Sequence, residues 1–146
     1  MKKLKNFIDT RFEDNIKAYK KLEEQAGSFS NFPETLHPDI NTELNRQGIT
    51  QLYSHQREAF DSISQNRDTL LVSQTASGKT LSFFLPILNE YLNADAPFSV
   101  LLLYPTKALS RDQESTFGGL MSVVKKSGRL GTFDGDTPRD ERVRIQ

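Results

Sequence analysis

A run of small and polar residues at positions 73–80 has the composition that binding a polyphosphate requires. It reads Ser-Gln-Thr-Ala-Ser-Gly-Lys-Thr. A polyphosphate is held by a ring of backbone amides, a mobile cation and a hydroxyl that ligates magnesium. Gly78 lets the backbone turn close to the phosphates, Lys79 supplies the cation, and Thr80 supplies the hydroxyl for Mg²⁺. The residues that we assign to this site are Gln74, Thr75, Ala76, Ser77, Gly78, Lys79 and Thr80, with Lys79 and Thr80 as its catalytic residues.

The elements on either side of this loop bear on whether it binds phosphate. The strict phosphate-loop pattern has glycine where this chain has Ser73, and Gly-Lys-Thr alone occurs by chance. The segment 68–73 is rich in apolar residues and predicts a short buried strand. Residues 79–93 carry leucines and phenylalanines on one side and predict a helix. A loop between a strand and a helix is the context in which a phosphate cradle occurs. The alternative is a polar turn that only caps the helix.

Strand and helix signals alternate through the rest of the chain. Residues 54–65 and 106–126 predict helices, and the continuous apolar run in 99–104 is typical of a parallel strand covered on both faces. A weaker strand signal covers 130–134, and Pro86 is expected to bend the helix over 79–93. The alternation predicts an α/β fold, a doubly wound parallel sheet flanked by helices.

The N-terminal third has a different pattern. Apolar residues recur at steps of three or four over about residues 3–25, which predicts an amphipathic helix docked on this chain or on a partner. Closely spaced glycine, serine and proline at 27–38 mark a break. A short helix capped by Asp39 or Asn41 then ends near Gln47, with Gly48 as its C-terminal stop. We therefore expect residues 1–47 to form a helical extension and linker, and residues 48–146 to belong to the α/β domain.

The composition of the 146 residues excludes several classes of protein. Lysine plus arginine number 19 and aspartate plus glutamate also number 19, so the chain is not a polycation that holds DNA by bulk charge. Zero cysteines exclude a disulfide scaffold and a cysteine-ligated metal. No apolar stretch approaches the length of a membrane span. We expect a soluble, cytoplasmic protein.

Four motifs in order resemble the opening motifs of superfamily 2 helicases, the DEAD/DEAH-box-like motors. They are Gly48–Gln56, Thr75–Thr80, Pro105–Leu109 and Phe133–Pro138. The spellings Thr-Ala-Ser-Gly-Lys-Thr and Asp-Gly-Asp-Thr-Pro are most similar to the DNA-repair branch, which includes the mitomycin-repair helicase and its eukaryotic RecQ-like relative. The resemblance implies a RecA-like P-loop NTPase domain, with ATP and Mg²⁺ as cofactors.

The resemblance also implies roles for residues outside the phosphate loop. Gln56 matches the glutamine whose amide can both donate to and accept from the edge of adenine. Thr106 and Lys107 match a motif that lies against the nucleic-acid backbone, where a hydroxyl, a cation and a helix N-terminus suit phosphate. Gly135, Asp136 and Thr137 match the next strand-contacting loop. Arg139, Arg142 and Arg144 either add backbone charge or belong to a solvated helix face.

An ATPase of this type also needs an acidic pair to hold Mg²⁺ and orient the attacking water. The family's acidic motif and its second RecA-like domain have no match in this sequence. Our hypothesis is that the chain is the N-terminal piece of a longer helicase, cut inside its first RecA-like domain and inactive by itself. Its partners would be single-stranded DNA and the rest of the helicase.

Two other functions remain open from the sequence. The chain could be a nucleotide-binding or partner-recruiting module without turnover, or a small P-loop NTPase of another type. The resemblance alone favours DNA over RNA.

Overall fold

A computed structural model describes residues 10–11, 27–72, 77–96, 99–122, 126 and 128–145. The amphipathic helix expected over residues 3–25 lies outside these residues, apart from positions 10 and 11. In the phosphate loop, Gln74, Thr75 and Ala76 also lie outside them. Ser77 is the first residue of the loop that the structure describes.

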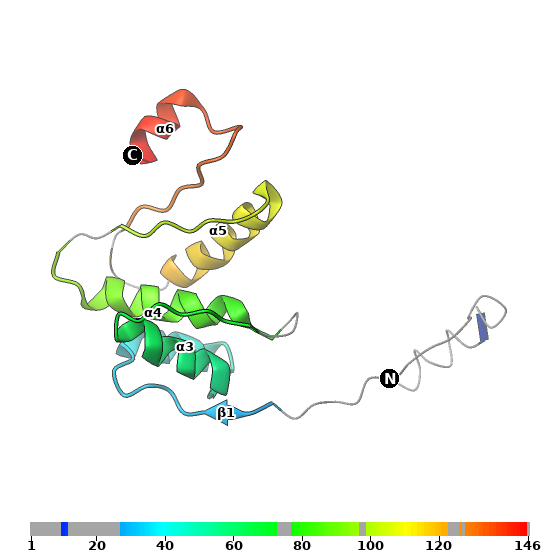
Figure 1. The fold of residues 1–146 in the computed structure, drawn as a ribbon, viewed down its shortest axis with the longest axis vertical. Coiled ribbons are helices and arrows are strands. Elements are labelled where there is room, and N and C mark those ends of the chain that lie inside the picture. Colours follow the sequence, from blue (N-terminus) through cyan, green and yellow to red (C-terminus); the bar gives the residue numbers. More distant parts are fainter. Residues whose placement is uncertain are drawn as a thin grey trace.

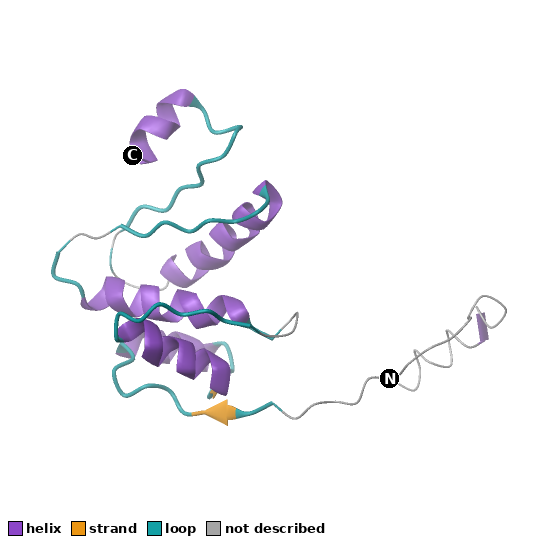
Figure 2. Ribbon diagram, in the orientation of Figure 1, coloured by secondary structure: helices purple, strands orange, loops and turns teal. Residues whose placement is uncertain are grey.

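Helices dominate the described residues (Figures 1 and 2). The helices are α2 (Pro38–Arg46), α3 (Ser54–Ser64), α4 (Lys79–Asn93), α5 (Lys107–Ser122) and α6 (Arg139–Ile145). Two short strands, β1 (Phe29–Ser30) and β2 (Leu52–Tyr53), pair antiparallel, with Phe29 opposite Tyr53 and Ser30 opposite Leu52. The helices predicted over 39–47, 54–65, 79–93 and 106–126 are present with closely similar bounds.

Local chemistry explains where two of these helices begin and end. The α2 helix starts with Pro38 in its first turn, and the His37 side chain accepts a hydrogen bond from the backbone amide of Asp39. Gly48 follows its end with a φ of 79°, in the left-handed region that glycine adopts without strain. Gly78 precedes α4 with a φ of 75°. The α4 helix runs through Pro86, which is buried.

The core lies between α3 and α4 and extends to their neighbours. The side chains of Phe60 on α3 and Phe84 on α4 are fully buried, as is Leu52 of β2. Phe117 of α5 packs against Phe84, with 4.6 Å between ring centroids. The rest of the core comes from α2, α4, α5 and the segment just before α2, namely Leu36, Ile40, Leu44, Leu85, Leu88 and Leu120. Burying each such side chain stabilises the fold by about 1.5–3 kcal/mol, so these four helices form one unit.

The parallel sheet predicted from the sequence is not seen. Among the described residues the only sheet is the β1–β2 pair, and the segments 68–72, 99–104 and 130–134 run as loops (Figure 2). The strands expected there are not formed by the described residues, and a parallel sheet stays a prediction. The physical reason is that a buried parallel strand needs a bonded neighbour and a covered face. Among the described residues these segments pair with no strand, and Leu70 is 90% exposed and Leu103 83% exposed, although Leu102 packs against the core.

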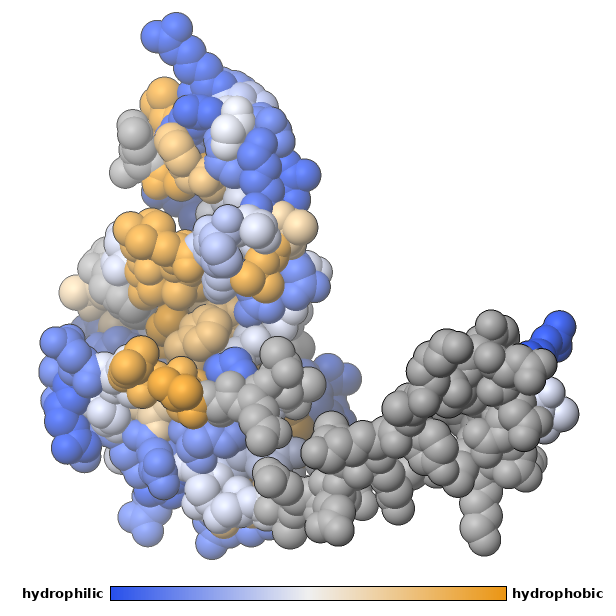
Figure 3. All heavy atoms as spheres, turned by 45° about the vertical axis from the view of Figure 1, so that its right-hand side comes forward, coloured by the Kyte–Doolittle hydropathy of each residue, from blue (hydrophilic) through white to orange (hydrophobic). Residues whose placement is uncertain are grey.

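These loops leave apolar side chains in contact with solvent. Figure 3 shows apolar side chains gathered on one face of the molecule. The most exposed of the large apolar side chains are those of Leu70, Val72, Leu101 and Leu103. Among the described residues, no helix is both long and apolar enough to cross a membrane.

Candidate nucleotide and nucleic-acid sites

Gln56 and Gly78 meet at the start of α4. Gln56 lies in the first turn of α3 and is only 3% exposed. Its Oε1 atom accepts a hydrogen bond from the backbone amide of Tyr53 at 2.9 Å, and its Nε2 atom donates to the carbonyl of Gly78 at 2.8 Å. The structure thus joins the glutamine that the resemblance assigns to adenine directly to the phosphate loop.

A side chain at Gly78 would have to displace Gln56. A Cβ atom added to it would lie 2.7 Å from Gln56 Nε2, closer than such atoms approach in proteins. Its φ of 75° also disfavours any other residue. Close approach and a left-handed backbone are both what a main-chain anion cradle requires at the entrance to a helix.

The two residues after Gly78 fit a magnesium-bound polyphosphate. Lys79 Nζ lies 3.4 Å from the hydroxyl of Ser77, at the N-terminus of α4, where the helix dipole also favours an anion. The hydroxyl of Thr80 donates to Oε1 of Gln113 on α5 at 3.3 Å, which leaves its oxygen lone pairs for a metal. The donor set therefore suits Mg²⁺ with a nucleotide, a cation for the phosphates and a hydroxyl for the metal.

Aromatic rings flank this site. The rings of Phe29 and Tyr53 stack with centroids 4.9 Å apart, and those of Tyr53 and His55 stack at 5.6 Å. Tyr53 also lies beside Gly78. The position of Phe29 beside this site was not predicted from the sequence, because a strand of two residues has no detectable periodicity.

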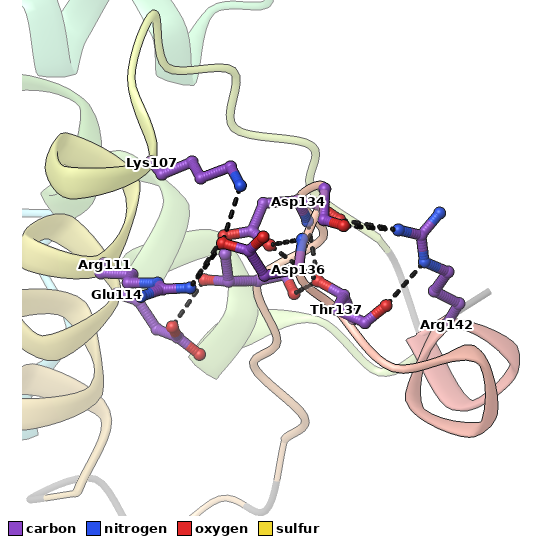
Figure 4. Close-up of polar contacts among 9 residues, drawn as sticks. Lys107, Arg111, Glu114, Asp134, Asp136, Thr137 and Arg142 are labelled. Atoms are coloured by element: carbon purple, nitrogen blue, oxygen red, sulfur yellow. Dashed lines mark hydrogen bonds and ion pairs between the residues drawn. The ribbon is translucent and has the colours of Figure 1, made fainter.

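A second polar cluster lies where α5 begins. Thr106 caps this helix, its hydroxyl accepting from the backbone amide of Leu109 at 3.2 Å. Lys107 Nζ lies 2.7 Å from Oδ2 of Asp136. Arg111, one turn further along α5, reaches Asp134 at 3.2 Å and Asp136 at 3.6 Å (Figure 4). Lys107 and Asp136, assigned separately from the sequence, thus come together.

The loop that carries Asp136 is organised by Asp134. Its carboxylate accepts from the backbone amide of Asp136 at 2.7 Å. This hydrogen bond, with the charges of Arg111 and Lys107 and the hydroxyl of Thr137, holds the pKa of Asp134 below its ordinary value. Thr137 turns inward, since its hydroxyl accepts from the amide of Asp134 at 2.8 Å and can donate to the carbonyl of Thr132 at 3.1 Å.

Arg142 of α6 closes the same loop from the other side. Its guanidinium donates to the carbonyls of Thr137 at 2.8 Å and Asp134 at 3.0 Å, and it lies over the ring of Phe133. Arg142 therefore supports the loop, which the sequence did not reveal. Arg111 was also missed, although its spacing of one helical turn from Lys107 is a usable signal.

The comparisons with known proteins bear on both sites. Residues 53–146 match the family model described as DEAD/DEAH box helicase. The chain belongs to this helicase family. It is 31% identical to an uncharacterized ATP-dependent helicase, YprA, of Bacillus subtilis, over 94% of this chain and 18% of that protein. It is 30% identical to ATP-dependent helicase hrq1 of Schizosaccharomyces pombe, over 91% of this chain and 12% of that protein.

Solved structures give the same family likeness. A crystal structure of the DUF1998 helicase MrfA bound to DNA and AMPPNP matches with a TM-score of 0.79 and 33% identity. The match covers 85% of this chain and 17% of that one. The resemblance to DEAD/DEAH-box-like helicases is thus confirmed. The relatives of the chain, hrq1 and MrfA among them, include helicases of the branch that the motif spellings indicated. The chain spans less than a fifth of the length of these relatives.

Proposed function

We propose that this helicase-family chain binds ATP with Mg²⁺ between Gln56 and the loop before α4, as the nucleotide-binding part of an ATP-dependent DNA helicase. The observation that carries the proposal is the hydrogen bond from Gln56 Nε2 to the carbonyl of Gly78. It brings a glutamine suited to an adenine edge beside a glycine suited to phosphate, although Gln56 lies on α3 and Gly78 precedes α4. Among the described residues the Gln56 amide makes only these two bonds, to Tyr53 and Gly78, and an amide has a further lone pair and a second N–H for a base.

Each residue of the site would have a distinct task. Lys79 would lie against the β and γ phosphates, and Thr80 would ligate Mg²⁺. Gln74, Thr75, Ala76 and Ser77 would supply the remaining backbone amides of the cradle. When bound, ATP supplies the phosphoanhydride bond whose cleavage drives movement along a strand.

The second part of the proposal concerns nucleic acid. Thr106 and Lys107 at the start of α5, with Gly135, Asp136 and Thr137 in the facing loop, would follow the backbone of a single strand. DNA is favoured over RNA by the MrfA structures, which are bound to DNA and match most of this chain. Contacts of this kind hold phosphates and do not read sequence.

We further propose that this segment, residues 48–146 with the extension before it, does not turn ATP over by itself. Hydrolysis needs a carboxylate that holds the metal and another that orients water. In the part of the chain that the structure describes, the partner of the Thr80 hydroxyl is the amide of Gln113 and not a carboxylate. Turnover would require the rest of a helicase, including a second RecA-like domain.

Two lysine variants test the two sites against each other. Binding of a fluorescent ATP analogue with Mg²⁺, and of a labelled single-stranded oligonucleotide, is measured for the wild type, Lys79→Ala and Lys107→Ala. We expect K79A to lose nucleotide binding and keep DNA binding, and K107A to do the reverse. Unchanged nucleotide affinity in K79A would overturn the nucleotide site. Competition by unlabelled DNA and RNA of one sequence then decides the preferred strand.

A further inference from the structure

We propose that Lys107 and Arg111 form a two-cation site for one backbone phosphate, and that the Asp136 carboxylate occupies this site while no nucleic acid is bound. The inference rests on the proposed function, because it takes the start of α5 as a surface for nucleic acid. It adds Arg111 to that surface. It also changes the role of Asp136 from a direct contact to an internal competitor.

The geometry places both cations on one oxygen atom. Lys107 and Arg111 are one helical turn apart, so their side chains share a face of α5. Oδ2 of Asp136 lies 2.7 Å from Lys107 Nζ and 3.6 Å from a terminal nitrogen of Arg111 (Figure 4). One carboxylate oxygen between an ammonium and a guanidinium stands where an oxygen of a phosphate would be held.

Asp136 is placed so that a phosphate can displace it. Its side chain is 65% exposed, and the partners seen among the described residues are these two cations. Exposed ion pairs of this kind contribute little to stability. A strand of nucleic acid carries many phosphates, and the release of its counterions further increases its binding affinity. A polyanion can therefore displace the carboxylate from the two cations.

Asp134 differs from Asp136, although both face Arg111. Its side chain is only 10% exposed and accepts from the amide of Asp136 as well as from Arg111. Arg142 holds the carbonyls of the same loop from α6. The loop therefore keeps its shape when the Asp136 side chain turns away. That side chain has to move for a phosphate to enter, while Asp134 keeps its bond of 3.2 Å to Arg111.

The test measures the affinity of the 146-residue chain for a fluorescein-labelled oligo(dT) strand by anisotropy, without nucleotide. Asp136→Asn removes the competing charge and keeps the size of the side chain. We expect it to tighten binding about two- to fivefold, the range that the loss of one exposed ion pair gives. Arg111→Gln is expected to weaken binding by a similar factor and to lower the salt dependence by about one phosphate contact.

Asp140→Asn is the matched control. Asp140 is an exposed acid in the first turn of α6 and makes none of the ion pairs seen in the described part of the chain. If D140N tightens binding as much as D136N, the effect is one of net charge and the proposal is overturned. The double variant R111Q/D136N should gain less over R111Q than D136N gains over the wild type. An equal gain would show that Asp136 does not act on Arg111.

Different outcomes would overturn the competitor role of Asp136 and the proposed nucleic-acid surface. If the wild type binds the strand, K107A weakens that binding, and D136N changes nothing, the competitor role is wrong while the proposed nucleic-acid surface stands. If neither the wild type nor D136N binds, both are wrong. Thermal unfolding of each variant, compared with the wild type, establishes that the loop and α5 are intact.

Discussion

The side-chain amide of Gln56 is bonded to the backbone at both of its ends, to the amide of Tyr53 and to the carbonyl of Gly78. The first bond closes the first turn of α3, and the second crosses to the residue that precedes α4. One buried glutamine therefore ties Gly78 to α3, in addition to the apolar packing between α3 and α4. Changes at either end of this bridge should affect the nucleotide site and the fold together.

Gly78→Ala is expected to lower the free energy of unfolding by more than Gly48→Ala does. Both glycines have a left-handed φ, 75° and 79°, so alanine at either position carries a backbone cost of about 1–2 kcal/mol. At Gly48 an added Cβ meets nothing within 4 Å, whereas at Gly78 it meets Gln56 Nε2 at 2.7 Å. Urea denaturation of the two variants measures the difference, which is the cost of displacing Gln56. Equal losses of unfolding free energy in the two variants would mean that Gln56 moves aside at no measurable cost.

Much of the helical part of the fold could be predicted from the sequence. The apolar repeat after Lys79 and the glycine before it locate α4, and the residues after Tyr53 locate α3. Apolar residues on the buried face of a helix recur every three or four positions, which makes such a face recognisable. The predicted strands are not seen among the described residues. Apolar runs such as the one ending at Leu103 indicate burial against neighbouring strands, and a run by itself cannot specify what those neighbours are.

The contacts within the sites were less predictable than the residues. Lys107 and Asp136 were both assigned to nucleic acid from motifs. Their ion pair depends on the tertiary fold, which places the loop that carries Asp136 against the start of α5. The bond from Thr80 to Gln113 is of the same kind. Such pairs leave no periodic signal, since they depend on how helices pack and not on local spacing.

Gln56→Glu is expected to disrupt the phosphate loop while leaving α3 largely intact. A glutamate keeps an oxygen that can accept from Tyr53, but it has no N–H to donate to the carbonyl of Gly78, and its charge repels that carbonyl. Leaving these buried groups unpaired costs about 1–3 kcal/mol. Nucleotide affinity should fall together with the denaturation midpoint. Gln51→Glu makes the same chemical change at an exposed position, where it removes only a solvent-exposed bond of 3.2 Å to Asn31, and should alter both far less.

Gln113→Ala is expected to weaken the Mg²⁺-dependent part of ATP binding. When the oxygen of Thr80 ligates the metal, its proton needs an acceptor, and Gln113 Oε1 stands at 3.3 Å. Loss of such a supporting partner typically costs about tenfold in metal affinity. Titrating Mg²⁺ into the chain with a fluorescent ATP analogue should show a shifted midpoint, whereas binding in EDTA should not change. Gln113→Glu keeps the acceptor and should retain the wild-type midpoint. An unshifted midpoint in Q113A would remove Gln113 from the site.

Glu43→Gln is expected to make the free energy of unfolding fall less steeply as the pH is lowered. The Glu43 carboxylate accepts two hydrogen bonds from Arg46, at 2.7 and 2.8 Å, and one from Gln47 at 2.7 Å. The bonds from Arg46, and then that from Gln47, lower its pKa from the ordinary value of 4.5. The unfolded chain therefore takes up this proton more readily than the folded one. The stabilising effect is complete above the ordinary value and is lost as the pH falls through the lowered pKa.

Urea denaturation of the wild type and E43Q at several pH values, from about 3 to 7, measures this effect. The difference in unfolding free energy between the two proteins should be largest at neutral pH and should shrink as the solution becomes acidic. Glu34→Gln is the control, because Glu34 is exposed and forms no ion pair among the described residues, so its difference should stay constant. A constant difference for E43Q as well would mean that the ion pair with Arg46 does not stabilise α2.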